Sequence, residues 1–179
     1  WNNAENAQFL VNQGGSIARQ GDFGQAIATF QQAKKLSPSI KVPAEDKVKR
    51  WAAGGLIEQG ENLVQEGKVQ EAVDAFEKAK QLDSTWKIPP ESWHTLCKYG
   101  VYKGAKIVLS ACDTAVALAP GNVDFRDSRG VARARMGDTA GAIEDFQASI
   151  EATDSAEGKK ERQGVIDKLK KGENPFTEN

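Results

Sequence analysis

Three segments of the chain repeat one another without gaps, and this repetition limits the possible folds more than any other feature. They begin at Gly21, Gly67 and Gly137 and read GDFGQAIATF, GKVQEAVDAF and GDTAGAIEDF. Each holds glycine, alanine five positions later, then isoleucine or valine, then phenylalanine three positions further on. A motif that recurs in this way indicates a stack of similar structural units. A second glycine precedes each segment by seven residues: Gly14, Gly60 and Gly130.

Each residue type that recurs in the motif has a physical purpose in a pair of helices. The upstream glycine is small where two helices touch closely. The second glycine adopts a positive φ at low cost, which suits a turn between helices. The alanine lets the next helix approach its partner, and the phenylalanine four residues later fills the space between them from the same face. The motif therefore predicts a helix, a tight turn and a second helix.

This pattern resembles the tetratricopeptide repeat (TPR) consensus, W-x₂-L-G-x₂-Y…A-x₃-F…P, which has a period of about 34 residues. The first unit places seven residues on signature positions: Leu10, Gly14, Ile17, Ala26, Phe30, Ala33 and Pro38. The second unit places six there: Leu56, Gly60, Leu63, Ala72, Phe76 and Ala79. The last matches at Gly130, Ala142 and Phe146, but Arg126 and Arg133 stand where apolar residues are usual. We expect these arginines to suit a unit near the end of the stack, where one face meets solvent or a cap.

The resemblance, to a bacterial-type TPR domain, implies an all-α, right-handed superhelical solenoid of about four units with a C-terminal capping helix. Gly21 and Gly67 are 46 residues apart, about 12 more than one period, whereas Gly67 and Gly137 are 70 apart, close to two periods. A degenerate unit must therefore lie between them, with Trp93 and Leu96 at its start and Gly104 at its turn. The predicted solenoid covers 1–172, with units at 7–40, 53–86, 90–122 and 123–156, a capping helix at 157–171, and a tail or linker at 173–179.

The 12 extra residues lie at 41–52, and Pro43 suits a helix start there. We expect one long first helix in the second unit, beginning near residue 44. Val48 and Trp51 in this extension either pack on the neighbouring unit or form part of a protruding arm that contacts a partner. Gly54 and Gly55 lie inside the helix and either kink it or allow close packing.

In the TPR family, the first helix of each unit lines a concave groove that holds a peptide or a helix. The resemblance implies that these residues line the groove: Val11, Asn12, Arg19, Ile57, Glu58, Glu61, Gln65, His94, Lys98, Tyr102, Asp127, Ser128 and Arg135. Tyr102, Ile57 and Arg135 are the predicted anchors, since aromatic residues and arginine dominate interface hot spots. Co-chaperone members of the family grip a C-terminal carboxylate with Lys and Asn. Val11, Gly15 and Glu61 replace that clamp here, so a chaperone tail is not the expected ligand.

Nothing in the sequence indicates chemistry, so we predict no enzyme, no catalytic residue, no cofactor and no metal. His94 is the only histidine, and its expected place is the surface or the groove. Cys97 and Cys112 are too few for a metal site and are expected to be reduced core residues, with a disulfide or a regulatory thiol as the alternatives. The acidic residues Asp124, Asp127, Glu144 and Asp145 are expected on solvated helix faces. No phosphate-binding glycine loop is present.

The charge is balanced, with 24 basic and 25 acidic residues, which argues against nucleic acid or an anionic membrane as partner. No apolar run approaches the roughly 20 residues of a membrane span, and no signal peptide is found, so a cytoplasmic location is expected. The chain opens without Met, which suggests a fragment of a longer protein.

The leading functional hypothesis is a scaffold that binds a peptide or a partner domain in the concave groove. One alternative is a regulatory or sensor domain of a larger bacterial enzyme, a protease or an NTPase, in which the groove contacts a neighbouring domain of the same chain. The other is self-association, with a homodimer formed through the 44–66 helix.

Overall fold

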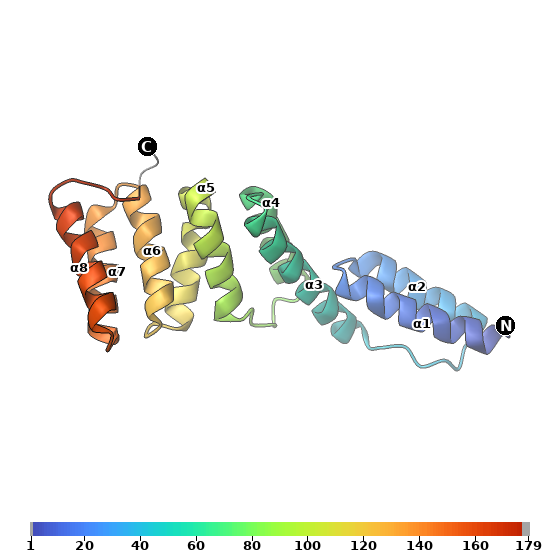
Figure 1. The fold of residues 1–179 in the computed structure, drawn as a ribbon. Coiled ribbons are helices and arrows are strands. Elements are labelled where there is room, and N and C mark those ends of the chain that lie inside the picture. The colour runs from blue at the N-terminus through green and yellow to red at the C-terminus, as the bar shows by residue number, and fades with distance from the viewer. Residues whose placement is uncertain (1, 177–179) are drawn as a thin grey trace. The chain divides into compact units, whose positions relative to one another are not determined.

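The computed structural model describes residues 2–176, and this part of the chain forms eight α-helices and no strand (Figure 1). The helices are α1 (Asn3–Arg19), α2 (Phe23–Leu36), α3 (Glu45–Gln65), α4 (Val69–Leu82), α5 (Pro90–Leu118), α6 (Val123–Arg135), α7 (Thr139–Ala152) and α8 (Ala156–Lys170). Polar caps fix several of their beginnings. The Asn2 side chain accepts from Glu5 N while the Glu5 carboxylate accepts from Asn2 N, a capping box at the start of α1. The predicted all-helical repeat is confirmed.

Four helices end in the same glycine turn. Gly21, Gly67, Gly137 and Gly172 all have φ between +80° and +92°. Each donates its N–H to the carbonyl three residues back, and the next residue donates to the carbonyl five residues before it, as Gly137 and Asp138 do at 3.0 and 2.9 Å. This is the Schellman arrangement, which satisfies the last carbonyls of a helix and favours glycine because of its positive φ. The first three turns join α1 to α2, α3 to α4 and α6 to α7.

The turn in α5 is different. Its helical geometry breaks at Gly104, the predicted turn position, where φ is −165° and ψ is 56°. The two halves of α5 then lie so close that a Cβ on Gly100 would stand 2.5 Å from Cγ1 of Val108. This reversal also brings together two positions, one seven residues before Gly104 and the other eight residues after it.

Those positions hold Cys97 and Cys112, which are joined by a disulfide. Both are fully buried, as expected, but the prediction that they are reduced is wrong. Sequence spacing alone gives no sign of the pairing. It follows from the fold of α5, which places the two Cα atoms 4.9 Å apart, within the range that a disulfide needs.

Within the helix pairs, the predicted contact of glycine with phenylalanine is confirmed. A Cβ on Gly14 would meet Cε1 of Phe30 at 2.8 Å, and one on Gly130 would meet Cζ of Phe146 at 3.0 Å. The phenylalanines are buried and fill the space that the missing side chains leave.

The chain divides into two compact units, and each is described by itself. Unit 1 comprises residues 1–62 and 74–87, and unit 2 comprises residues 63–73 and 88–179. Unit 1 therefore contains α1, α2 and most of α3 and α4. Unit 2 contains the α3–α4 turn and α5 to α8, in which each helix from α5 to α8 packs against the next.

In unit 1, the first turns of α3 pack on α1 and α2. Val48 is fully buried in a cluster with Ala18, Ala26 and Phe30, and Trp51 packs against the same cluster. Of the two interpretations of the extension, packing on the neighbouring helix pair is therefore confirmed. Gly55 serves the same contact, because a Cβ there would stand 2.6 Å from the backbone nitrogen of Gly21.

Candidate partner-binding face

The first half of α5 presents three of the predicted groove residues on one side. His94, Lys98 and Tyr102 follow one another at four-residue spacing, so they share a helix face. Ser128 and Arg135, seven residues apart on α6, lie against the two ends of this row. We call these five residues the α5–α6 face.

At one end of the α5–α6 face, His94 is held between two residues of α6. Its Nε2 lies 2.9 Å from the Ser128 hydroxyl oxygen, and its ring stacks on Phe125 with centroids 4.4 Å apart. Burial lowers the pKa of His94 below its usual value, and the charge of Lys98 lowers it further. Both effects favour the neutral form of the ring.

At the other end, Arg135 connects three segments of unit 2. Its guanidinium lies 5.4 Å from the centre of the Tyr102 ring and donates to the Tyr102 carbonyl at 3.2 Å. It also donates to the carbonyl of Phe176. Arg135 therefore joins α5, α6 and the segment that follows α8, and its role as a partner anchor stays a prediction.

Lys98 and Tyr102 are the two members of the face that remain open to solvent. Tyr102 is 51% exposed, and the Lys98 ammonium lies 5.7 Å from the ring centre of Tyr99. A cation beside an exposed aromatic ring offers both charge and apolar area to a ligand.

Asp127 lies on α6 next to the face, but its charge is already matched. Its carboxylate accepts from Nε of Arg162 on α8, with 3.0 Å to each oxygen. The hydrogen bond to Asp127 raises the pKa of Arg162. Asp127 is half-buried and joins α6 to α8, and it is not on the solvated face that the sequence suggested.

The remaining predicted groove residues differ widely in exposure. Arg19 is exposed and lies over the Trp51 ring at 4.6 Å, and Asn12 is exposed and accepts from Gln8 at 3.2 Å. Glu58 and Gln65 are exposed, whereas Val11 and Glu61 are half-buried. Ile57 is only 5% exposed, so it has little surface to serve as the predicted anchor.

A buried ion-pair cluster that the sequence did not predict lies between α5, α6 and α7. The carboxylate of Asp145, 1% exposed, accepts from Arg129 at 2.9 and 2.6 Å. Arg133 lies 3.1 Å from the same carboxylate and Arg126 lies 3.8 Å from it, while Arg129 also reaches Asp113 at 3.3 Å.

This cluster overturns two predictions. Asp145 is not solvated, whereas Asp124 and Glu144 are exposed as expected. Arg126 and Arg133 do not face solvent or a cap, because they turn toward a buried carboxylate and neutralise it. The sequence does contain a sign of the cluster: two arginines occupy apolar positions of α6, and an acidic residue precedes the core Phe146 of α7.

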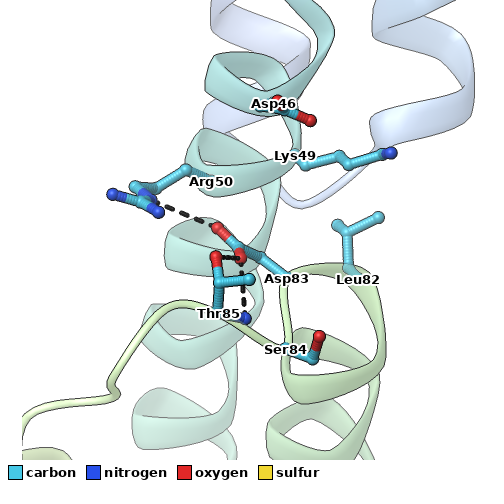
Figure 2. A pocket seen from close by; sticks show the side chains of 7 residues that line it. All are labelled: Asp46, Lys49, Arg50, Leu82, Asp83, Ser84 and Thr85. Atoms are coloured by element: carbon cyan, nitrogen blue, oxygen red, sulfur yellow. Dashed lines mark hydrogen bonds and ion pairs between the residues drawn. The ribbon is translucent and has the colours of Figure 1, made fainter.

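Unit 1 has a polar hollow of about 340 Å³ between α3 and the end of α4 (Figure 2). Arg50 donates to Asp83 at 3.1 Å, and Asp83 also accepts from the Thr85 hydroxyl at 2.7 Å. The Thr85 hydroxyl does most to lower the pKa of the Asp83 carboxyl. Asp46 and Lys49 complete a lining of balanced charge, so the hollow is best explained as a tie between α3 and α4.

Among the described residues, no group of three or more His, Cys, Asp and Glu side chains is placed to hold a metal ion. No helix in the described part of the chain is long and apolar enough to cross a membrane.

Comparisons with known proteins agree with this architecture. Residues 2–39 match the family model of the tetratricopeptide repeat. Among solved structures, the chain is similar to one described as the first TPR of Spaghetti (RPAP3) bound to the HSP90 peptide SRMEEVD. That similarity has a TM-score of 0.50 and 24% identity, over 67% of this chain and 91% of the other. A search of the curated proteins finds no match. The two matches support a tetratricopeptide-repeat fold.

Proposed function

We propose that this chain is a non-catalytic scaffold that binds a segment of another polypeptide, and that the α5–α6 face is part of its binding surface. One observation carries the proposal. Residues that the sequence predicted to line the groove, from two separate helices, contact each other in pairs: His94 with Ser128 and Tyr102 with Arg135. These contacts hold α5 and α6 together at the face, while the side chains of Lys98 and Tyr102 stay exposed to solvent.

The chemistry of the exposed pair favours a particular kind of ligand. Lys98 offers a positive charge and Tyr102 offers a half-exposed ring with a hydroxyl at its edge. A segment with a carboxylate and an apolar or aromatic side chain close together would match both. The Spaghetti domain is described with a bound HSP90 peptide. We do not extend that ligand to this chain, because Val11, Gly15 and Glu61 cannot supply a carboxylate clamp.

The disulfide bears on where this binding takes place. Disulfides persist in oxidising compartments and are rare in the cytosol, where thiols are kept reduced. The Cys97–Cys112 bond therefore favours an oxidising compartment over the cytoplasmic location expected from the sequence.

Affinity capture with a double variant tests the proposed face. We expect Lys98→Glu with Tyr102→Ala to lose the partners that the wild-type protein captures, because the variant reverses the charge and removes the ring. Partners identified by mass spectrometry would then be titrated as purified segments, with a loss of affinity of at least about tenfold expected for two interface anchors.

A matched control is available on the second half of α5. Lys106→Glu with Leu118→Ala makes the same charge reversal and removes an apolar side chain that is 52% exposed, close to the 51% of Tyr102. This control should keep the partners. If the control and the test variant capture the same proteins with the same affinity, the α5–α6 face is not the binding surface.

A further inference from the structure

A second hollow lies in unit 1, on α2 and not on the α5–α6 face. Its volume is about 400 Å³, within the range of about 300–1,000 Å³ that is usual for ligand sites. Ile27 and Phe30 on α2 form one side, and Val42 and Pro43 in the α2–α3 connection form the other.

The inserted segment creates this hollow. Val42 and Pro43 lie between the end of α2 at Leu36 and the start of α3 at Glu45, where the chain is about 12 residues longer than one repeat period. Val42 packs against the cluster that contains Phe30, which anchors the connection and holds the apolar wall in place.

The rim of the hollow is positively charged. Lys34 and Lys35, in the last turn of α2, both line it and are both exposed. Neither forms an ion pair within the described part of the chain. The carboxylate in the lining, that of Glu45, pairs with Lys49 at 2.9 Å, so it does not offset the two lysines.

From this combination we infer that the hollow is a second binding site, which takes a peptide segment of a partner protein in which an apolar side chain is flanked by carboxylates. The apolar side chain enters the hollow and contacts its apolar lining, and the carboxylates meet Lys34 and Lys35 at the rim. Charge complementarity at the rim selects the acidic ligand, and apolar burial supplies the affinity. The inference does not depend on the α5–α6 face, which lies on other helices.

Three labelled pentapeptides test the inference by fluorescence anisotropy with the whole chain: Glu-Leu-Glu-Leu-Glu, Lys-Leu-Lys-Leu-Lys and Glu-Ser-Glu-Ser-Glu. We expect only the first to bind, and we expect added salt to weaken its binding, since exposed charges are screened. Methyl NMR should show that the signals of Ile27 and Val42 shift on titration. Equal binding of the lysine and glutamate peptides would overturn the inference.

Two variants locate the binding. Lys34→Gln with Lys35→Gln should lower the affinity for the glutamate–leucine peptide at least tenfold. Val42→Ser should also lower this affinity, although both lysines remain. The control is Lys170→Gln with Lys171→Gln, which removes the same charges from a lysine pair at the end of α8. Circular dichroism checks that each variant stays folded. Unchanged affinity in both test variants, or methyl shifts confined to unit 2, would show that the hollow is not the site.

Discussion

Asp145 combines near-complete burial with a full set of partners. The Asp145 carboxylate has three arginines within 4 Å, and Arg129 forms two hydrogen bonds to it. Removing one partner of a buried ion pair is costly because the remaining charge is left without compensation in a poorly solvated place. The cluster therefore fixes how α6 packs on α7, and its effect is larger than that of a surface pair.

We predict that Asp145→Asn lowers the free energy of unfolding by about 3–5 kcal/mol. Urea unfolding followed by circular dichroism measures this change. The adjacent Glu144 is exposed, and Glu144→Gln should change stability by no more than about 0.5 kcal/mol. Similar changes in the free energy of unfolding for the two substitutions would mean that the ion pairs of Asp145 stabilise the fold no more than an exposed carboxylate does.

Sequence reasoning failed at this residue for a physical reason. The types and spacing of Arg126 and Arg133 marked a departure from the repeat pattern, but a charge at an apolar position can face solvent or meet an opposite charge. The packing of α6 on α7 decides between these two outcomes, and the residue pattern within one helix does not predict that packing. The same holds for Ile57, whose position on the first helix of a unit matched the groove although its side chain is buried.

At the scale of the element, the packing of α3 depends on one small residue, Gly55. Gly54 and Gly55 are neighbours on this helix, but their surroundings differ. A Cβ on Gly54 would meet only Trp86, at 3.9 Å, whereas one on Gly55 would meet the backbone of Arg19 and Gly21. Backbone atoms cannot rotate out of the way as a side chain can, so α3 can approach the α1–α2 turn only because Gly55 lacks a side chain.

We therefore predict opposite effects for two adjacent substitutions. Gly54→Ala should stabilise the protein by up to about 1 kcal/mol, because alanine favours the helix more than glycine does. Gly55→Ala should destabilise it by about 1–3 kcal/mol, because the overpacked contact must open. Thermal unfolding of both variants measures the difference, and stabilisation by Gly55→Ala would contradict the close approach.

On this scale the sequence was a good guide. The glycine-to-phenylalanine motif correctly predicted which residues meet inside the helix pairs, and the position of Gly104 correctly marked the break in α5. The reason is that these contacts are local, with partners about 16 residues apart in one helix pair. The disulfide was not predicted, because it depends on how the cysteine side chains of the two halves of α5 point toward each other.

For the whole molecule, the disulfide distinguishes the two units. It lies in unit 2 and closes a loop with a sequence separation of 15 residues. A bridge across a loop of this length stabilises by about 3 kcal/mol in the chain-entropy model. Each helical repeat of a repeat protein contacts mainly the adjacent repeats, so loss of the bridge should affect only the helices near it.

We predict that a reductant increases hydrogen exchange in α5 and leaves exchange in α1 and α2 unchanged. Exchange mass spectrometry with and without dithiothreitol measures this. The Cys97→Ser, Cys112→Ser double variant should show the raised exchange in α5 from the start and no response to dithiothreitol. A response spread equally over both units would contradict the local role of the bridge.

The repeated glycine turns also tell a protein engineer where foreign sequence can be placed. At Gly21, Gly67 and Gly137, two backbone hydrogen bonds and a positive φ fix the length of the connection, so an epitope or fluorophore inserted there would separate paired helices. The connection from α2 to α3 has no positive-φ glycine and has already accommodated extra residues. Its exposed Pro38 and Ser39 form a single turn, closed by the hydrogen bond from the Ile40 N–H to the Ser37 carbonyl at 3.0 Å. Because they lie outside both the helix pairs and the α2 hollow, a graft there would open one turn and leave the paired helices in contact.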